Sequence, residues 1–179
     1  MNSGIRFSRR PCQQREYGFI LITSMLMLVM LTILGVSMGK SFGLQELIAG
    51  NQREKIRAFG AAESTLNYAE WWLNQPNNAG TGTICTGVTT TPIVCSNALA
   101  NPTVLDSITH RWLVGVNYTP PDMSISTTGG VGSYYAIPMF YIQYLGSSPS
   151  TGNNLYRITS LGYGGDVSSV AVVQSIYEF

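Results

Sequence analysis

An unbroken apolar run follows a charged segment near the beginning of the chain. Residues 19–38, FILITSMLMLVMLTILGVSM, contain no charged side chain. A helix rises about 1.5 Å per residue, so this run would span roughly the 30 Å of hydrocarbon in a bilayer. The pattern predicts a membrane-spanning helical segment over residues 19–40.

A helical pattern of apolar and polar positions continues after this run. Apolar residues recur at steps of three and four, with polar residues on the other side. These apolar positions are Leu44, Leu47, Ile48, Ile56, Phe59, Leu66 and Leu73. Because proline disfavours helical conformation in the residue before it, the helix is expected to end ahead of Pro76. The sequence predicts an outer helical half over 41–75, whose apolar stripe needs a partner surface.

Short apolar stretches alternate with Gly, Ser, Thr and Asn after residue 76. Stretches rich in Val, Ile and Tyr predict four strands. They cover residues 111–118, 134–145, 155–163 and 167–179. The sequence Gly-Gly-Asp at 164–166 is typical of a hairpin turn, and 77–110 and 119–133 are expected to be loops.

These elements predict an α+β fold. A mostly antiparallel sheet needs an apolar layer on one face, and the outer half of the long helix can supply it. We therefore expect a long N-terminal helix packed on a C-terminal antiparallel sheet, within a globular domain over 76–179.

Charge is distributed unevenly along the chain. The net charge is +1, and the first eighteen residues carry four arginines and one glutamate, so residues 19–179 sum to −2. Basic residues beside the first apolar segment hold that end in the cytoplasm, which places the residues after Met38 outside. The nearly neutral exterior gives no electrostatic signature of nucleic-acid binding.

The three cysteines fall on both sides of the predicted membrane segment. Cys12 lies on the cytoplasmic side, whereas Cys85 and Cys95 form an even pair outside, where disulfides persist. A bridge between them would close a small loop and stabilise the fold by roughly 2.5 to 3 kcal/mol. Zinc is a poor alternative because a structural site needs about four ligands, and the single histidine, His110, has no cysteine near it in sequence.

No catalytic constellation emerges from the sequence. His110 is not accompanied by a nucleophile motif, and the glycine-rich stretches lack the strand and helix that flank a phosphate-binding loop. Acids and bases at helical spacing over 46–70 are typical of a solvated helix face. We expect a non-enzymatic protein with no cofactor and no metal ion.

Two separate stretches carry a family pattern. A glycine precedes the apolar run in GFILITSMLMLVMLTILGVSM, and LQELIAGNQREKIRAFGAAESTL follows at 44–66. With YRITSLGYGGDVSSVAVVQSIYEF at 156–179, these stretches resemble the PilX-type minor pilins of bacterial type IV pili. The resemblance implies a leader over 1–18, cleavage between Gly18 and Phe19 by a prepilin peptidase, and methylation of the new amine on Phe19.

Thr23 departs from the common pilin pattern. It would be the fifth residue of the mature chain, where most pilins carry a glutamate that neutralises the amine of a neighbouring subunit. An unpaired charge is costly in an apolar core, and the first subunit of a filament has no predecessor to pair with. We therefore expect a priming or tip-proximal role; the alternative is a threonine that only bonds back to its own helix.

The resemblance also implies a function and partners. The chain is expected to be a minor pilin that is incorporated in the fibre or primes it near the tip, supporting pilus biogenesis, twitching motility and adhesion. Expected partners are other minor pilins, the major pilin, the prepilin peptidase, the inner-membrane assembly platform and, before assembly, membrane lipid. Glu46, Arg57 and Glu63 are expected to contact neighbouring subunits.

The expected location changes with assembly. Before assembly the chain would lie in the inner membrane with a cytoplasmic N-terminus and a periplasmic globular domain; afterwards it would lie in the extracellular pilus. Two alternatives remain: a minor pseudopilin of type II secretion, and a single-pass membrane-anchored adhesin or binding protein.

Overall fold

The structure, a computed structural model, describes residues 17–119, 125–130 and 132–178. The expectations for the leader over residues 1–16 lie outside the described residues. The elements are α1 (Tyr17–Leu73), β1 (Val88–Thr89), β2 (Val94–Cys95), β3 (Gly115–Asn117), β4 (Met139–Ser147), β5 (Asn154–Tyr163) and β6 (Val170–Glu178). The chain divides into two compact units, Met1–Leu47 and Ile48–Phe179, and α1 contributes to both.

The first unit contains the apolar part of α1. Residues 18–39 are all exposed, and the apolar side chains from Phe19 to Met38 keep between 49% and 70% of their surface accessible. Within the described residues, α1 is the helix long and apolar enough to cross a membrane, with a mean hydropathy of 2.6 over its most apolar window. The predicted membrane segment is therefore a helix that finds no cover among the described residues.

The end of α1 agrees with the sequence-based prediction. The helix stops at Leu73, three residues before Pro76. Backbone carbonyls of the last turn are satisfied by the residues that follow, since Asn74 N–H donates to Glu70 O at 3.2 Å and Asn78 Nδ2 donates to Trp72 O at 2.8 Å.

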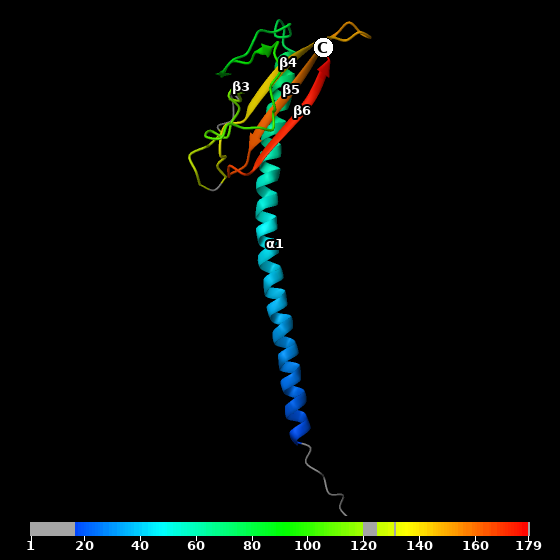
Figure 1. The fold of residues 1–179 in the computed structure, drawn as a ribbon, viewed down its shortest axis with the longest axis vertical. Coiled ribbons are helices and arrows are strands. Elements are labelled where there is room, and N and C mark those ends of the chain that lie inside the picture. The colour runs from blue at the N-terminus through cyan, green and yellow to red at the C-terminus, as the bar shows by residue number, and fades with distance from the viewer. Residues whose placement is uncertain (1–16, 120–124, 131, 179) are drawn as a thin grey trace, which may run out of the picture. The chain divides into compact units, whose positions relative to one another are not determined.

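The second unit is built on a six-stranded sheet with the order β1-β3-β4-β5-β6, and β2 pairs with β4. Figure 1 shows the last part of α1 lying along β4, β5 and β6. The pairs β3-β4, β4-β5 and β5-β6 are antiparallel. The pairs β1-β3 and β2-β4 are parallel, so the sheet is mixed rather than simply antiparallel.

The four predicted strands are present in the predicted order as β3, β4, β5 and β6, although their bounds differ. β3 starts only at Gly115 because Trp112 turns its indole into the core and donates to Pro102 O at 2.8 Å. β4 starts at Met139, immediately after Pro138, which has no backbone N–H to give to a neighbouring strand. The segment 77–110 was expected to be a loop, but it contains the two-residue strands β1 and β2.

One face of the sheet packs on the outer part of α1, as predicted. The buried residues that meet there come from the helix, from strands β2 to β5 and from the residue that follows β3. They are Leu66, Ala69, Leu73, Val94, Val116, Tyr118, Phe140, Ile142, Tyr156 and Ile158. This layer confirms the α+β class and provides the main core of the unit.

The predicted apolar stripe of the helix is only partly right. Leu66 and Leu73 are buried, but Ile56 and Phe59 are 63% and 51% exposed. Leu44, Leu47 and Ile48 are also exposed. The buried face instead consists largely of small residues, Ala58, Ala62, Thr65 and Ala69.

A close approach of α1 to β5 explains this choice of small residues. A Cβ atom added at Gly162 would lie 2.3 Å from Ala58 O and 2.4 Å from Ala62 N. One added at Gly164 would lie 2.6 Å from Glu54 O. The helix and the strand therefore touch backbone to backbone, and a large side chain in either would separate them.

Loops cover the opposite face of the sheet. A second core there contains Cys95, Trp112, Met139, Tyr141, Leu161 and Tyr163. Tyr141 and Tyr163 each donate a 2.8 Å hydrogen bond, to Asn97 O and His110 O respectively. Burial raises the pKa of Tyr163 to about 12, so its hydroxyl remains a hydrogen-bond donor.

Replacing Gly162 tests the close approach. Gly162→Ala should lower the free energy of unfolding by about 3 kcal/mol, because the new methyl group overlaps two backbone atoms of α1. The matched control is Gly60→Ala on the exposed side of α1, where nothing lies within 4 Å of the new Cβ. This control should be stabilising by up to about 1 kcal/mol, since alanine is the better helix former. Chemical denaturation in detergent measures both variants, and equal effects would contradict the packing.

Candidate functional site

The expected cleavage junction lies in the first turn of α1. Gly18 and Phe19 follow the first helical residue, Tyr17. Phe19 is 68% exposed, and a Cβ atom built on Gly18 would meet nothing within 4 Å. No described part of the chain therefore packs against the junction.

Thr23 bonds to its own helix. Its hydroxyl lies 3.1 Å from Phe19 O and 3.0 Å from Ile20 O. Ser24 and Thr32 make similar bonds one turn back, to Leu21 O and Val29 O. Each hydroxyl is therefore satisfied inside the helix, which lowers the cost of placing this segment in an apolar environment.

Arg57 makes several contacts within the second unit. Its Nη1 donates to both Glu54 carboxylate oxygens at 3.1 and 3.0 Å, and its Nη2 donates to Gly132 O and Ser133 O at 2.8 Å each. The guanidinium carbon also lies 4.8 Å from the centre of the Tyr134 ring. The side chain expected to contact a neighbouring subunit thus holds a loop of its own chain against α1.

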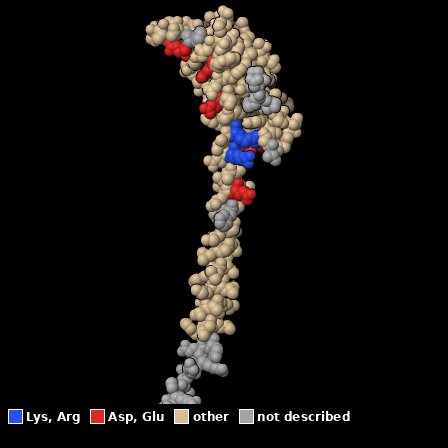
Figure 2. Space-filling model, turned by 180° about the vertical axis from the view of Figure 1, so that it is seen from behind, with Lys and Arg blue, Asp and Glu red and all other residues tan. Residues whose placement is uncertain are grey.

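Glu54 and Lys55 tie the same turn of α1 to the β5-β6 connection. Glu54 Oε2 accepts a 2.5 Å hydrogen bond from Gly165 N–H, and Lys55 Nζ donates to Ser168 O at 2.8 Å. Figure 2 shows the Lys and Arg side chains gathered at one place on an otherwise sparsely charged face. We call these contacts of Glu54, Lys55 and Arg57 the helix clamp.

The helix clamp changes the acidity of Glu54. The hydrogen bond from Gly165 N–H is the main cause that holds the pKa of Glu54 below its usual value. Desolvation opposes this effect, and the hydrogen bond and charge of Arg57 add to the lowering. The carboxylate is therefore ionised in its clamped form. The sequence showed a Glu and an Arg three residues apart, but nothing in it indicated that both reach loops more than 70 residues away.

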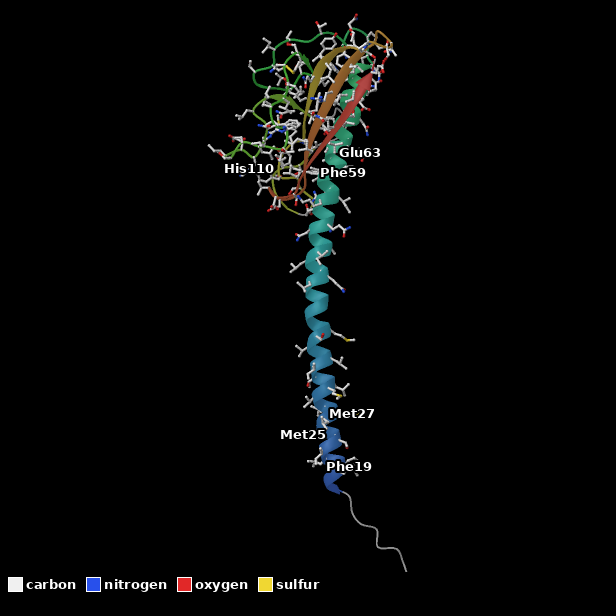
Figure 3. All side chains as sticks on the ribbon, turned by 45° about the vertical axis from the view of Figure 1, so that its right-hand side comes forward. Phe19, Met25, Met27, Phe59, Glu63 and His110 are labelled. Atoms are coloured by element: carbon white, nitrogen blue, oxygen red, sulfur yellow. A yellow bond between two sulfur atoms is a disulfide. The ribbon has the colours of Figure 1, made fainter. Side chains whose placement is uncertain are left out.

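The two other residues expected to contact neighbouring subunits have no partner in the part of the chain that the structure describes. Glu46 and Glu63 are both exposed on α1, and neither has a hydrogen bond or ion pair with a described residue. Figure 3 shows Glu63 and Phe59 on the part of α1 that lies beside the sheet. Contacts of these acids, and of Arg57, with a neighbouring subunit stay a prediction.

Cys85 and Cys95 form the expected disulfide, with their Cα atoms 5.5 Å apart. It closes a loop that contains β1 and the start of β2. Asn97 braces this loop, since its Oδ1 accepts from Cys85 N at 2.8 Å and its Nδ2 donates to Cys85 O at 3.0 Å. Across the described ranges, no group of three or more His, Cys, Asp or Glu side chains could hold a metal ion.

Two protein-family models together match almost the whole described chain. The family described as PilX N-terminal matches residues 18–67, and the one described as type IV pilus assembly protein PilX C-term matches residues 58–178. The chain belongs to the PilX family. Searches of curated proteins and of solved structures each returned no significant match. The family assignment confirms the resemblance to a PilX-type minor pilin of type IV pilus assembly, and this family is structural rather than catalytic.

Acidification tests the helix clamp of this PilX protein. A carboxyl group whose pKa is lower in the folded than in the unfolded chain stabilises the fold above its unfolded pKa, and this contribution is lost as the pH falls through the folded pKa. Glu54→Gln should therefore lower the Tm near pH 7, and the difference from the unmodified protein should shrink below about pH 4.

Glu63→Gln is the matched control because Glu63 has no partner among the described residues. It should leave the Tm unchanged at both pH values, as measured by circular dichroism in detergent. A Glu54→Gln difference that is the same at pH 7 and pH 3 would contradict the role given to the ionised carboxylate.

Proposed function

We propose that this PilX protein is a minor pilin that enters the type IV pilus or primes it near the tip, and thereby supports pilus biogenesis, twitching motility and adhesion. The observation that carries the proposal is the part of α1 in the first unit, where the apolar side chains are exposed all around the helix. Such a surface is stable only in lipid or against other apolar helices.

Both environments are used in turn. Before assembly, residues 19–40 cross the inner membrane, with the leader in the cytoplasm and the globular domain over 76–179 in the periplasm. After cleavage between Gly18 and Phe19, the same side chains pack against the helices of other minor pilins and the major pilin. At about 25 cal/mol per Å², burying a segment of this length is worth tens of kcal/mol, so a chain that leaves the bilayer must exchange lipid for protein.

Thr23 supports a place at the start of the fibre. The support comes from the absence of a carboxylate at this position, whereas the bonds of the hydroxyl to Phe19 O and Ile20 O are what the alternative also expects. The lack of a carboxylate costs least in the first subunit of the fibre, because there is no earlier subunit whose amine must be neutralised.

The family assignment favours the pilus over type II secretion, because both matching families are described by their part in type IV pilus assembly or by the PilX name itself. A membrane-anchored adhesin would share the apolar helix, but it would need neither cleavage at Phe19 nor exchange of lipid for other helices.

Processing provides the first test of this function. In cells that contain a prepilin peptidase, mass spectrometry of the mature chain should find Phe19 at its N-terminus with a methylated amine. Gly18→Val should leave the leader attached, because a branched side chain blocks close approach to the scissile bond. Gly80→Val, in the exterior domain, is the control and should be processed normally. A leader that remains intact in the unmodified chain would argue for the anchored adhesin.

Charge at position 23 provides the second test. Thr23→Glu should reduce the number of surface fibres, because at the first position in the fibre the new carboxylate has no amine to meet. Thr23→Val removes the bond to the helix without adding charge and should leave fibre number unchanged. Electron microscopy of a deletion strain complemented with each variant measures the effect. Normal piliation in the uncomplemented deletion strain, or with Thr23→Glu, would exclude the priming role.

A further inference from the structure

The two edges of the sheet differ sharply. One edge ends in the two-residue strand β1, which is followed and preceded by loops. The other edge is β6, nine residues long and paired only with β5 among the described strands. Its sequence, VAVVQSIYE, contains no Lys, Arg or Pro and carries its single charge at Glu178. Natural sheets usually protect such an edge with a bulge, a proline or inward charges, and β6 has none of these.

The hydrogen-bonding pattern between β5 and β6 shows which backbone N–H and C=O groups of β6 point away from the sheet. Ser169 O accepts from Gly164 N at 2.7 Å, so Ser169 turns its peptide groups toward β5. Because successive residues alternate sides, the peptide groups of every second residue after it point away from the sheet. These outward residues are Val170, Val172, Gln174, Ile176 and Glu178. Their outer N–H and C=O groups have no hydrogen-bond partner among the described residues.

A flank of α1 runs beside this open edge. Lys55 binds Ser168 just before β6, and Asn74 Nδ2 donates to the Tyr177 hydroxyl near its end, so the helix and the strand run in the same direction. The Glu70 carboxylate accepts a 2.7 Å hydrogen bond from Ser175 Oγ. The side of α1 that carries Glu70 therefore faces β6.

Two exposed residues of α1 lie on the same flank. Phe59 and Glu63 precede Glu70 by 11 and 7 residues, which places all three on one side of the helix. Phe59 is 51% exposed, and Glu63 has no partner among the described residues. An added strand beside β6 would cover both side chains.

The charges along this surface indicate which kind of strand would bind beside β6. The charged side chains on the α1 side of this surface are Glu63 and Glu70, Glu178 lies on the other face of β6, and residues 58–73 and 170–178 contain no lysine or arginine. A second copy paired through β6 would bring the Glu63 and Glu70 side chains of both copies into one groove, where like charges repel. A basic strand meets the same acids favourably.

We propose that the open edge of β6, together with the flank of α1 that carries Phe59 and Glu63, is a docking site for an extended strand of another polypeptide. The strand pairs with the outward peptide groups of β6. Its residues facing α1 are basic, and the alternate residues are apolar and lie beside Val172 and Ile176, the latter 65% exposed. This site rests on the geometry of the second unit and goes beyond the proposed function.

A designed peptide tests the docking site. The probe is a fluorescein-labelled nine-residue peptide that alternates Lys with Val or Thr, added to the full-length protein in detergent micelles. Fluorescence anisotropy should show saturable binding, and amide exchange should slow at Val172, Gln174 and Ile176. A peptide with Glu in place of Lys, and one with Pro at its centre, should each bind about tenfold more weakly.

Matched variants locate the binding on the protein. Gln174→Pro removes an outward N–H without taking a hydrogen bond from β5, and should weaken binding about tenfold, whereas Gln174→Thr should not. Glu63→Lys should weaken it about threefold or more, whereas Glu46→Lys makes the same change of net charge in the first unit and should have no effect. Circular dichroism confirms that each variant is folded.

Three results would overturn the site. The first is equal binding of the Lys and Glu peptides, or no binding of either. The second is an equal loss with Glu46→Lys and Glu63→Lys, which would indicate attraction to net charge alone. The third is a Gln174→Cys variant that cross-links to itself and resists competition by the peptide, which would assign the edge to a second copy. A chain that is cleaved at Phe19 and found in fibres but fails these tests would lose only the docking site.

Discussion

The exposure of the apolar side chains from Phe19 to Met38 is the constraint on which the rest of the structure depends. These side chains surround the helix on all sides, so no single face could be buried by folding the chain back on itself. Water is excluded as a permanent environment, and only lipid or other apolar helices remain. The hydroxyls of Thr23, Ser24 and Thr32 fit both, because each bonds to a carbonyl of its own helix. A subunit that moves from a membrane into a bundle of helices needs no change of conformation in this segment.

A different solution holds the second unit together. There the helix meets the sheet at Gly162 with almost no side chain between the backbones, and the helix clamp fixes the same end through Glu54, Lys55 and Arg57. Close backbone contact gives a well-defined register, because an Ala face and a Gly offer few other ways to pack. The clamp then adds directional bonds to two loops. The apolar residues displaced from the interface, such as Ile56 and Phe59, are left on the surface of α1.

The sequence predicted the elements better than their contacts. The apolar run, the helix end before Pro76 and the Val, Ile and Tyr rich strands follow from local preferences, and all are present. The buried helix face was predicted correctly only at Leu66 and Leu73, because apolar size was the guide, whereas the distance to Gly162 selected Ala58 and Ala62. β1 and β2 were missed because a two-residue strand has no periodicity. The intramolecular bonds of Arg57 depend on loops far along the chain, and no local pattern encodes them.

The two stretches that carry the family pattern meet in space, and this contact gives the pattern a physical meaning. Residues 44–66 supply the Ala face and the helix clamp, while 156–179 supply Gly162, the turn at Gly165 and the edge strand β6. In this chain the contact fixes the position of the last hairpin on the helix, and with it the position of the open edge. The disulfide loop packs on the other face of the sheet, around Cys95 and Trp112. Val94 of the same loop is buried in the main core with Leu66 and Leu73, so this loop couples the two faces of the sheet, and a change in its sequence is felt on the side that meets the helix.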